Sequence, residues 1–598
     1  MSLFLPSNLF FRLLLFKYFS LSLIFFLSMF VERIPNRNSN PTFLIRESKW
    51  VDGKAVKRTL ANITKLPLPI IEQIKLLLKG GTVVQAFDDM FEIQSTLPHG
   101  HVAAVLGTME QLKIPELIGP KNSRFRRLVL GMIAARVLSP ASKLATGYMM
   151  DSDSPSSTLN EELGLKRVDQ DDLYEAMDQL VTHKTDIECR LAKRHLKEGA
   201  LVLCDVTSSY VEGQKNELAD FGFSKDEKRN KKQVVIGLMT DEDGCPVGVE
   251  AFKGNTADVS TLSTQIVKIQ KTFGLENVVL VGDRGILKQK QLNEEIMPVG
   301  LDWVTAMQKS QIREIVEQEK VQMSLCDQQN LTEIYSDLYP EDRLILCKNP
   351  VLAASKKEKR DKLLRLTEKL LDPIVEATKR ESRKLKGKDK IGERVGKVIN
   401  KYKMAKFFDR EYGEESFSYS RKEELIEKAE LFDGVYAIRS SLKDHPEAEE
   451  LVANYKRLST VEVAFRTMKT ISLHIRPIHH RIKNRVIAHV FLCMLAYYVE
   501  YHMRKKLAPM LFAEEKPLER RAQREDVVAP SQPSEAVKKA DTGEKVMSFA
   551  NVLDMLSGLC RTVVIPKIST KNKPEVVMVR KISATQKRAL KLLGVNYK

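Results

Sequence analysis

Residues 200–283 constrain the fold more than any other part of the chain, because they combine short β-type runs with one helical segment. Three apolar runs follow one another, ALVLCDVTSSYV, QVVIGLMTD and PVGVEAFKG, and Asp243-Gly244 predicts a tight hairpin between the second and the third. A segment with helical periodicity, STLSTQIVKIQKTFG, then leads to a fourth run of buried type, VVLVGD. Three strands, a helix and a fourth strand predict an α/β domain.

This order of elements is the start of a ribonuclease-H-like fold, in which the first and fourth strands lie side by side. Asp205 lies in the first run and Asp283 ends the fourth, so the two carboxylates are predicted to converge. Each Asp taken alone is also consistent with an ordinary turn or cap residue. Two like charges at neighbouring strand ends are costly without a cation, however, so the pair favours metal binding.

A third acidic residue, Glu462, begins an amphipathic helical segment. Arg466 and Lys469 follow it at i+4 and i+7, so all three side chains project from one face. Ser459-Thr-Val-Glu462 also matches a capping box, in which Glu462 would be structural. A Glu–Arg pair at this spacing is, in addition, a common surface ion pair. The spacing alone leaves these interpretations open.

The surroundings of the three acids resemble the DDE-type transposases of bacterial insertion sequences. The matching motifs are D-V-T-S at Asp205, V-G-D-R-G at Asp283, and Y-x6-E-x6-K ending at Lys469. The closer resemblance is to the group with a long insertion between the second Asp and the Glu. F-x-G-N-T-x-D at 252–258 and R-P-I-x-H at 476–480 add to the similarity, which covers roughly residues 29–510.

This chain departs from the family signature at one position. The signature places an Arg three residues after the Tyr, whereas here Leu458 stands three residues after Tyr455 and Arg457 precedes it. Any role for that Arg is therefore in doubt. In relatives an aromatic residue of the insertion holds a flipped base, but Trp303 lies close behind Asp283 and is expected to pack in the core instead.

The resemblance implies a metal-dependent enzyme acting on double-stranded DNA, both the inverted-repeat ends of its element and a target. Asp205, Asp283 and Glu462 would ligate two divalent ions, Mg²⁺ or Mn²⁺, for an in-line displacement. Tyr455 and Lys469 would hold the phosphate beside the cleaved bond, with Arg466 as a further candidate. A homodimer in the active complex, associated with the nucleoid in a prokaryotic cytoplasm, would follow.

Charge supports a polyanionic partner, since the chain carries a net +18. Residues 356–406 contain 19 Lys/Arg against 8 Asp/Glu and so supply +11 of that excess. A solvated helical arm and a DNA-contacting arm are both consistent with this run. Lys384, Lys386 and Lys388 are the candidate DNA-binding residues there.

Two features bear on location. The seven cysteines are scattered without a C-x-x-C pair, which favours reduced thiols in a cytoplasmic protein over disulfides or a zinc site. The hydrophobic residues 1–28 are interpreted as an extension outside the core, translated from upstream sequence, with an anchor or signal as the alternative. The apolar segment 486–503 contains His489 and Glu500, which favour a buried core helix, so no membrane partner is expected.

At 598 residues the chain should form several domains, with a ribonuclease-H-like catalytic domain interrupted by an insertion and a mostly helical N-terminal region. The predicted divisions are 1–28 (extension), 29–65 (β-hairpin region), 66–199 (helical DNA-binding region), 200–298 (first catalytic part), 299–430 (insertion with the basic arm), 431–510 (second catalytic part) and 511–598 (disordered linker and tail). Two alternatives stay open: a ribonuclease-H-like nuclease without strand transfer, and a non-catalytic DNA-binding protein derived from a transposase.

Overall fold

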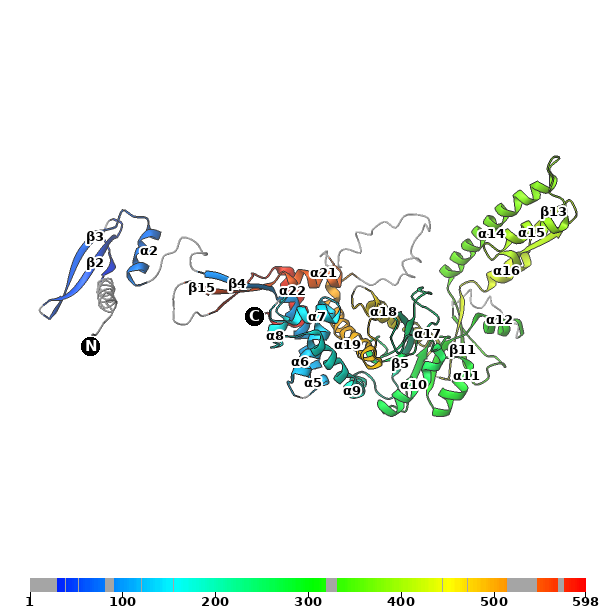
Figure 1. The fold of residues 1–598 in the computed structure, drawn as a ribbon, viewed down its shortest axis with the longest axis horizontal. Helices are drawn as coiled ribbons and strands as arrows, with labels where there is room; N and C mark the ends of the chain where they lie inside the picture. The colour runs from blue at the N-terminus through cyan, green and yellow to red at the C-terminus, as the bar shows by residue number, and fades with distance from the viewer. Residues whose placement is uncertain are drawn as a thin grey trace, which may run out of the picture. The chain divides into compact units, whose positions relative to one another are not determined.

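The computed structural model describes residues 29–80, 91–318, 331–512 and 546–597, apart from positions 38, 52, 120, 154, 444, 471 and 568–574. The hydrophobic extension and the linker 513–545 lie outside the described residues. The chain divides into two compact units (Figure 1). One comprises the residues up to Thr96 together with Thr562–Val579, and the other comprises Leu97–Arg561 with Arg580–Lys598.

The N-terminal residues form a small antiparallel sheet. Its strands, in the order β1-β2-β3, are β1 (Met29–Ile34), β2 (Thr42–Val51) and β3 (Lys54–Asn62). The helix α2 (Leu68–Leu78) follows, and Phe43, Ile63 and Ile71 form a minimal core. A second three-stranded sheet, in the order β16-β15-β4, contains β4 (Phe91–Pro98), β15 (Cys560–Pro566) and β16 (Val576–Val579). The strand β4 interrupts a region predicted to be helical.

Helices dominate the chain from residue 100 to 195, as the apolar periodicity predicts. They are α4 (Gly100–Gln111), α5 (Ile114–Ile118), α6 (Arg124–Leu138), α7 (Lys143–Met150), α8 (Leu159–Glu162) and α9 (Gln170–His195). Ser139-Pro140 separates α6 from α7, because proline cannot continue the helix. The long α9 begins with a capping box between Asp169 and Asp172.

The centre of the larger unit is an eight-stranded mixed sheet in the order β10-β11-β14-β9-β8-β5-β6-β7. Its strands are β5 (Leu201–Tyr210), β6 (Gln233–Thr240), β7 (Pro246–Phe252), β8 (Val279–Gly282), β9 (Asp302–Ala306), β10 (Leu331–Ile334), β11 (Arg343–Lys348) and β14 (Val435–Ser440). The strands β5, β6 and β7 pair antiparallel, whereas β8 pairs parallel to both β5 and β9. The predicted α/β class and the predicted neighbourhood of the first and fourth strands are confirmed.

Helices along this sheet include α10 (Leu262–Val267), α11 (Gln289–Gln291), α17 (Ala448–Lys456), α18 (Leu458–Lys469) and α19 (Lys483–Leu507). The sheet also extends into residues that the sequence assigns to the insertion, because β9 pairs with β8, and β10 and β11 join the sheet through β14. Trp303 in β9 is only 1% exposed and packs in the core, as predicted. The guanidinium of Arg439 lies 5.3 Å from its ring.

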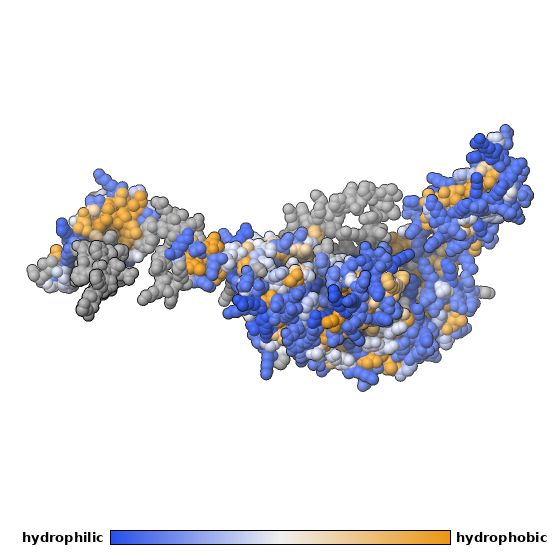
Figure 2. Space-filling model, in the orientation of Figure 1, coloured by the Kyte–Doolittle hydropathy of each residue, from blue (hydrophilic) through white to orange (hydrophobic). Residues whose placement is uncertain are grey.

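Between β11 and β14 the chain forms a small folded body with its own core. It contains α14 (Pro350–Lys379), α15 (Lys388–Ile399), β12 (Phe408–Tyr412), β13 (Phe417–Arg421) and α16 (Glu423–Leu431) (Figure 1). The predicted single basic arm is thus two helices packed on a hairpin, and Figure 2 shows both hydrophilic residues and an apolar patch on the surface of this body. Residues 350–434 contain 23 Lys/Arg against 17 Asp/Glu. The acids after residue 406 fold back onto the basic run and offset part of its charge.

The helix α19 lies at the centre of the main core. Within the described residues, Lys483–Met510 is long and apolar enough to span a membrane, as is the bent pair α6 and α7 if taken as one span. The most apolar window of Lys483–Met510 is 83% buried by the protein itself, as expected for a core helix. The C-terminal α21 (Phe549–Ser557) and α22 (Ala584–Leu593) pack into the same core, so these residues are not a loose tail.

Candidate active site

The parallel pairing of β5 and β8 brings Asp205 and Asp283 together. Cys204 lies opposite Gly282 in the register of the two strands. Asp205 directly follows Cys204 and Asp283 directly follows Gly282, so the two Asp residues also lie side by side. Neighbouring strands lie about 4.8 Å apart. The residues before each Asp are apolar and buried. Their burial holds both strands in the core and so fixes the position of each Asp.

The carboxylates of Asp283 and Glu462 both lie near enough to Asp205 to act on its charge. Burial, together with the nearby carboxylates of Asp283 and Glu462, raises the pKa of Asp205 to about 6. Lys225 and a hydrogen bond from the Val206 N–H (2.7 Å) act in the opposite direction. The site therefore holds more negative charge than its own cations neutralise.

Asp283 is held by the turn that follows β8. Its Oδ1 accepts hydrogen bonds from the N–H groups of Gly285 and Ile286, both at 3.0 Å. A Cβ on residue 285 would meet the two carboxylate oxygens at 3.2 and 3.3 Å, so glycine leaves room for this carboxylate. The turn interpretation of Asp283 and the ligand interpretation are compatible, since the turn uses only Oδ1.

Glu462 reaches the site from α18, which contacts β5. The helix begins at Leu458, so Ser459 lies inside it, and the Arg457 cap makes no side-chain hydrogen bond. The capping-box interpretation of Glu462 is therefore wrong. Glu462 and Arg466 are both described and exposed, yet no ion pair joins them. The carboxylate of Glu462 has neither of the structural roles that the sequence left open.

Tyr455, on α17, lies beside the same three acids. Burial raises its pKa to about 12, and the carboxylates of Asp283, Glu462 and Asp205 contribute to that shift. Arg284, directly after Asp283, lowers it. The phenol therefore stays protonated and can donate a hydrogen bond into the site.

Lys469 lies on the site face of α18 and is nearly buried, with 10% of its side chain exposed. Its ammonium group donates to Thr207 Oγ1 at 2.6 Å and to Asp226 Oδ1 at 2.8 Å. Thr207 stands two residues after Asp205, on the same face of β5. Burial lowers the pKa of Lys469 more than the Asp226 carboxylate raises it.

Lys225 and its partner Asp258 are site residues that the sequence did not single out. Lys225 Nζ donates to the Val206 carbonyl and pairs with Asp258 Oδ2 at 3.0 Å, which fixes an ammonium group beside Asp205. Asp258 ends the F-x-G-N-T-x-D motif, and that motif was the available signal. Lys225 comes from the irregular segment between β5 and β6, where no periodicity marks a residue's neighbours.

A family model described as a transposase DDE domain matches residues 197–499, just over half of the chain. The chain belongs to the DDE transposase family. Members of this family cleave and join DNA phosphodiester bonds and use divalent metal ions. No curated protein matches the chain.

The departure of this transposase from the family signature has a structural account. Arg457 donates to the Glu242 carbonyl at 3.3 Å and pairs with the carboxylates of Glu242 and Asp243. It thus binds the β6–β7 turn to the start of α18. Leu458, at the signature position, packs against the main core.

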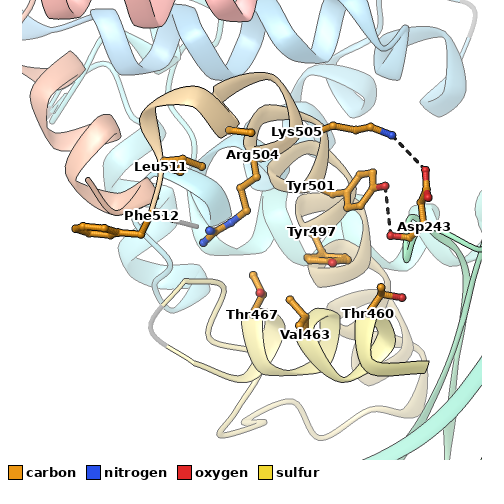
Figure 3. Close-up of a pocket in the computed structure, with 11 residues that line it drawn as sticks. Asp243, Thr460, Val463, Thr467, Tyr497, Tyr501, Arg504, Lys505, Leu511 and Phe512 are labelled. Atoms are coloured by element: carbon orange, nitrogen blue, oxygen red, sulfur yellow. Dashed lines mark hydrogen bonds and ion pairs between the residues drawn. The ribbon is translucent and has the colours of Figure 1, made fainter. Parts of the chain in front are cut away.

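A cavity of about 480 Å³ in the transposase lies against a different face of α18 from the one that carries Glu462. Figure 3 shows Thr460, Val463 and Thr467 of α18 facing Tyr497 and Tyr501 of α19 across it. On a helical wheel Thr460 and Thr467 lie about 140–160° from Glu462, and Val463 lies about 100° from it. The cavity is therefore separate from the acidic site.

One further cluster in the transposase contains metal-ligand types. Cys245 Sγ lies 3.8 Å from His195 Nε2 and 3.7 Å from His502 Nε2. The two nitrogens of His195 already contact the Tyr498 hydroxyl at 2.9 Å and the Asp241 carboxylate at 3.4 Å. The cluster joins α9 and α19 to the β6–β7 turn through these polar contacts.

The predicted DNA-binding lysines of the insertion differ in their surroundings. Lys384 and Lys386 both pair with Glu415, at 2.8 and 2.7 Å, whereas Lys388 is exposed at the start of α15. Lys384 and Lys386 lower the pKa of Glu415 to about 2. Much of the predicted basic character is therefore neutralised within the insertion.

Proposed function

We propose that this chain is the DNA transposase of a bacterial insertion sequence, which binds the inverted-repeat ends of its element and catalyses cleavage and strand transfer. The observation that carries the proposal is the convergence of Asp205, Asp283 and Glu462, with the raised pKa of Asp205 as its electrostatic sign. Membership of the DDE transposase family supports the same reaction class.

The donor set fits divalent cations. Three carboxylates from β5, the β8 turn and α18 face one another with only Lys225 close to Asp205, and hard oxygen ligands are those that Mg²⁺ and Mn²⁺ prefer. Asp205, Asp283 and Glu462 would hold two such ions. When bound, the ions supply a polarised nucleophile and stabilise the charge on the leaving oxygen.

The chain's own residues would position the DNA for that displacement. Tyr455, protonated at neutral pH, would donate a hydrogen bond to a phosphate oxygen beside the acids. Lys469 and Arg466 occupy the same helix face as Glu462, and Arg466 is exposed without an acidic partner among the described residues. Lys225, fixed beside Asp205 by Asp258, would steady that carboxylate against its acidic neighbours.

Further parts of the proposal concern the fold and the partners. The strand order β7-β6-β5-β8-β9, with three antiparallel strands followed by two parallel ones, supports a ribonuclease-H-like catalytic domain. The helical region 66–199 would bind the element ends. The lysines at 384, 386 and 388 would contact the DNA backbone, with Lys388 contributing most because Glu415 pairs with the other two. The active complex would be a homodimer in the prokaryotic cytoplasm, without a membrane partner.

The alternative functions are a ribonuclease-H-like nuclease without strand transfer and a non-catalytic DNA-binding protein. The test is incubation of the purified protein with a labelled duplex that carries the inverted repeat flanking the gene, a target plasmid and Mg²⁺. A transposase nicks at the repeat boundary and joins the freed 3′ end to the plasmid. Nicks without joined product would favour the nuclease, and binding without nicks the non-catalytic protein.

A further inference from the structure

A second cavity of about 340 Å³ has many cationic and imidazole groups in its lining. It lies where the break between α6 and α7 meets the segment that follows α18, with Tyr174 of α9 on its wall. Its basic and imidazole lining residues are Arg136, Lys143, His474, Arg476, His479, His480 and His489. No carboxylate lines it among the described residues.

Two of these cations are buried without a counter-ion. Arg136 and Lys143 are each only 6% exposed. Arg136 donates to the carbonyls of Leu473 and His474, both at 3.3 Å, which orders the segment but does not neutralise the guanidinium. In the described part of the chain, Lys143 has no hydrogen-bond or ion-pair partner, and it lines the cavity. Burying such charges is costly unless an anion compensates them.

The electrostatics of the neighbouring groups point the same way. Burial and the nearby Arg136 lower the pKa of Lys143 to about 7. Burial together with Lys143 and Arg136 lowers the pKa of His480 to about 3, so this imidazole is neutral and can accept or donate one hydrogen bond. The cavity thus has an excess of positive potential that the protein itself does not relieve.

The start of α7 adds hydrogen-bond donors. Ser142 caps this eight-residue helix by accepting from the Ala145 N–H at 3.2 Å, and both Ser142 and Lys143 line the cavity. A helix N-terminus favours anions because its first N–H groups are unpaired. The unpartnered ammonium of Lys143 at the same place makes this end a specific site for an anion rather than a generic helix start.

Arg476 connects the cavity to the acidic site. Its guanidinium pairs with Asp226, and its Nε donates to the Lys469 carbonyl at 3.3 Å. Asp226 also holds the Lys469 ammonium, which reaches Thr207 beside Asp205. An anion in the cavity and a phosphate at the acids would therefore be linked through a short chain of buried ion pairs.

We propose that this cavity, with Lys143 and Arg136 as its principal cations, binds a phosphate group of the DNA strand whose neighbouring phosphodiester lies at the acidic site. The inference rests on the proposed function for the identity of the DNA. The same chemistry could come from an internal backbone phosphate or from the terminal 5′-phosphate of a cleaved end. In both cases the pocket fixes the register of the strand without reading its bases.

The test measures DNA binding in Ca²⁺, by fluorescence anisotropy, for wild type and Lys143→Gln. Gln keeps most of the length of the side chain and removes an unpaired buried charge, so the variant should fold at least as well, which its melting temperature checks. The exposed Lys271→Gln, outside the region proposed to bind the element ends, is the matched control. We expect K143Q to bind about tenfold more weakly, as for loss of one charge-assisted hydrogen bond, and K271Q to match wild type.

Position is tested with duplexes that carry one neutral methylphosphonate at successive positions around the repeat boundary. One position should weaken wild type strongly and K143Q hardly at all. If the sensitive group is instead the 5′-phosphate of a pre-cleaved duplex, compared with its 5′-hydroxyl form, the terminal phosphate is the ligand. Equal affinity of K143Q and wild type, with the same methylphosphonate pattern, would overturn the proposal.

The two proposals fail separately. A wild-type protein that nicks the duplex in Mg²⁺ while K143Q binds normally would keep the transposase and reject the phosphate pocket. A wild-type protein that never nicks or joins DNA, but whose duplex binding depends on Lys143 and on one phosphate, would keep the pocket and reject the transposase.

Discussion

The acidic site and the insertion show opposite ways of handling charge. Around Asp205 three carboxylates converge beside few cations, and burial raises the pKa of Asp205 to about 6. In the insertion, by contrast, Lys384 and Lys386 share Glu415, and Arg421 pairs with Glu368 at 2.6 Å. The insertion carries more charged residues, yet its charges are largely matched inside the protein.

The difference teaches that uncompensated charge, rather than the amount of charge, distinguishes a ligand site from a solvated surface. The basic cavity around Lys143 belongs with the acidic site in this respect, although its sign is opposite. Burial of an unpaired charge is costly, and a bound ligand of opposite sign offsets that cost. The following experiments either break or sharpen this comparison.

The largest effect is expected at the acidic site. Asp205→Asn, Asp283→Asn and Glu462→Gln should each lower the cleavage rate by about a thousandfold, equivalent to about 4 kcal/mol of transition-state stabilisation. Melting temperature should not fall, and in metal-free buffer it should rise slightly for Asp205→Asn, since that variant no longer buries a carboxylate. Glu242→Gln, on the nearby β6–β7 turn, is the control that should keep full activity.

If a variant loses stability as well as cleavage activity, the acidic residue that it replaces has a structural role. Cleavage at the wild-type rate in any of the three would remove that residue from the site.

The next effect concerns the buried pair of Lys469 and Asp226. Lys469→Met should lower the free energy of unfolding by about 3 kcal/mol, because it leaves Asp226 buried with Arg476 as its remaining partner. The double variant Lys469→Met/Asp226→Asn should recover most of that stability but still bind cleaved ends weakly. Denaturant unfolding and anisotropy measure the two effects. Additive stability losses would show that the two side chains do not act as a pair.

A smaller effect is expected from pH at the basic cavity. Lys143 is surrounded by Arg136 of α6, by His489 and Cys493 of α19, and by His480. Its folded-state pKa of about 7 lies below the unfolded value of 10.5, so unfolding takes up a proton between these pH values. The DNA-free protein should therefore gain stability from this residue as pH rises from 7 to 10.5.

DNA affinity should change in the opposite sense, because bound phosphate stabilises the ammonium form of Lys143. Anisotropy titrations at pH 7 and pH 9 should show weaker binding at the higher pH for wild type and little change for Lys143→Gln. A pH dependence shared by both proteins would assign it to another group.

The smallest effect is expected in the insertion. Each DNA phosphate contact contributes about 0.9 to the log–log salt slope of binding. Lys384→Gln and Lys386→Gln should each change the slope by well under that value, since Glu415 already pairs with both. Lys388→Gln, which removes an exposed ammonium, should change it more. A full change of about 0.9 at Lys384 or Lys386 would break the comparison by placing the insertion among the ligand sites.

The sequence predicts the core of the fold well, because buried strands have a strong local signature. The runs that become β5, β6, β7 and β8 are continuous and apolar, and their order alone predicts that Asp205 and Asp283 meet. The pairing of β9 and β11 with β14 is harder to predict, since the small body at 350–434 separates β14 from both strands along the chain. Local patterns carry no information about such distant pairing.

The site is predicted less completely than the sheet. Three spaced acids could be found from motifs, but Lys225 and Asp226 lie in an irregular segment whose neighbours only the folded chain defines. The capping-box match at Ser459 failed because α17 runs almost directly into α18, so the helix starts one residue before the predicted cap. The basic cavity is formed by residues more than three hundred positions apart, so no single segment of the sequence predicts it.

The central claim is that Asp205, Asp283 and Glu462 form one divalent-cation site, and Mn²⁺ binding tests it most directly. Electron paramagnetic resonance of free Mn²⁺ during titration gives the affinity of wild type, of the three neutral variants and of the Glu242→Gln control. The account predicts that each of the three variants loses at least about tenfold in affinity, as for loss of one charged ligand, while the control binds as wild type. Wild-type affinity in Glu462→Gln, or equal losses in the control, would contradict it.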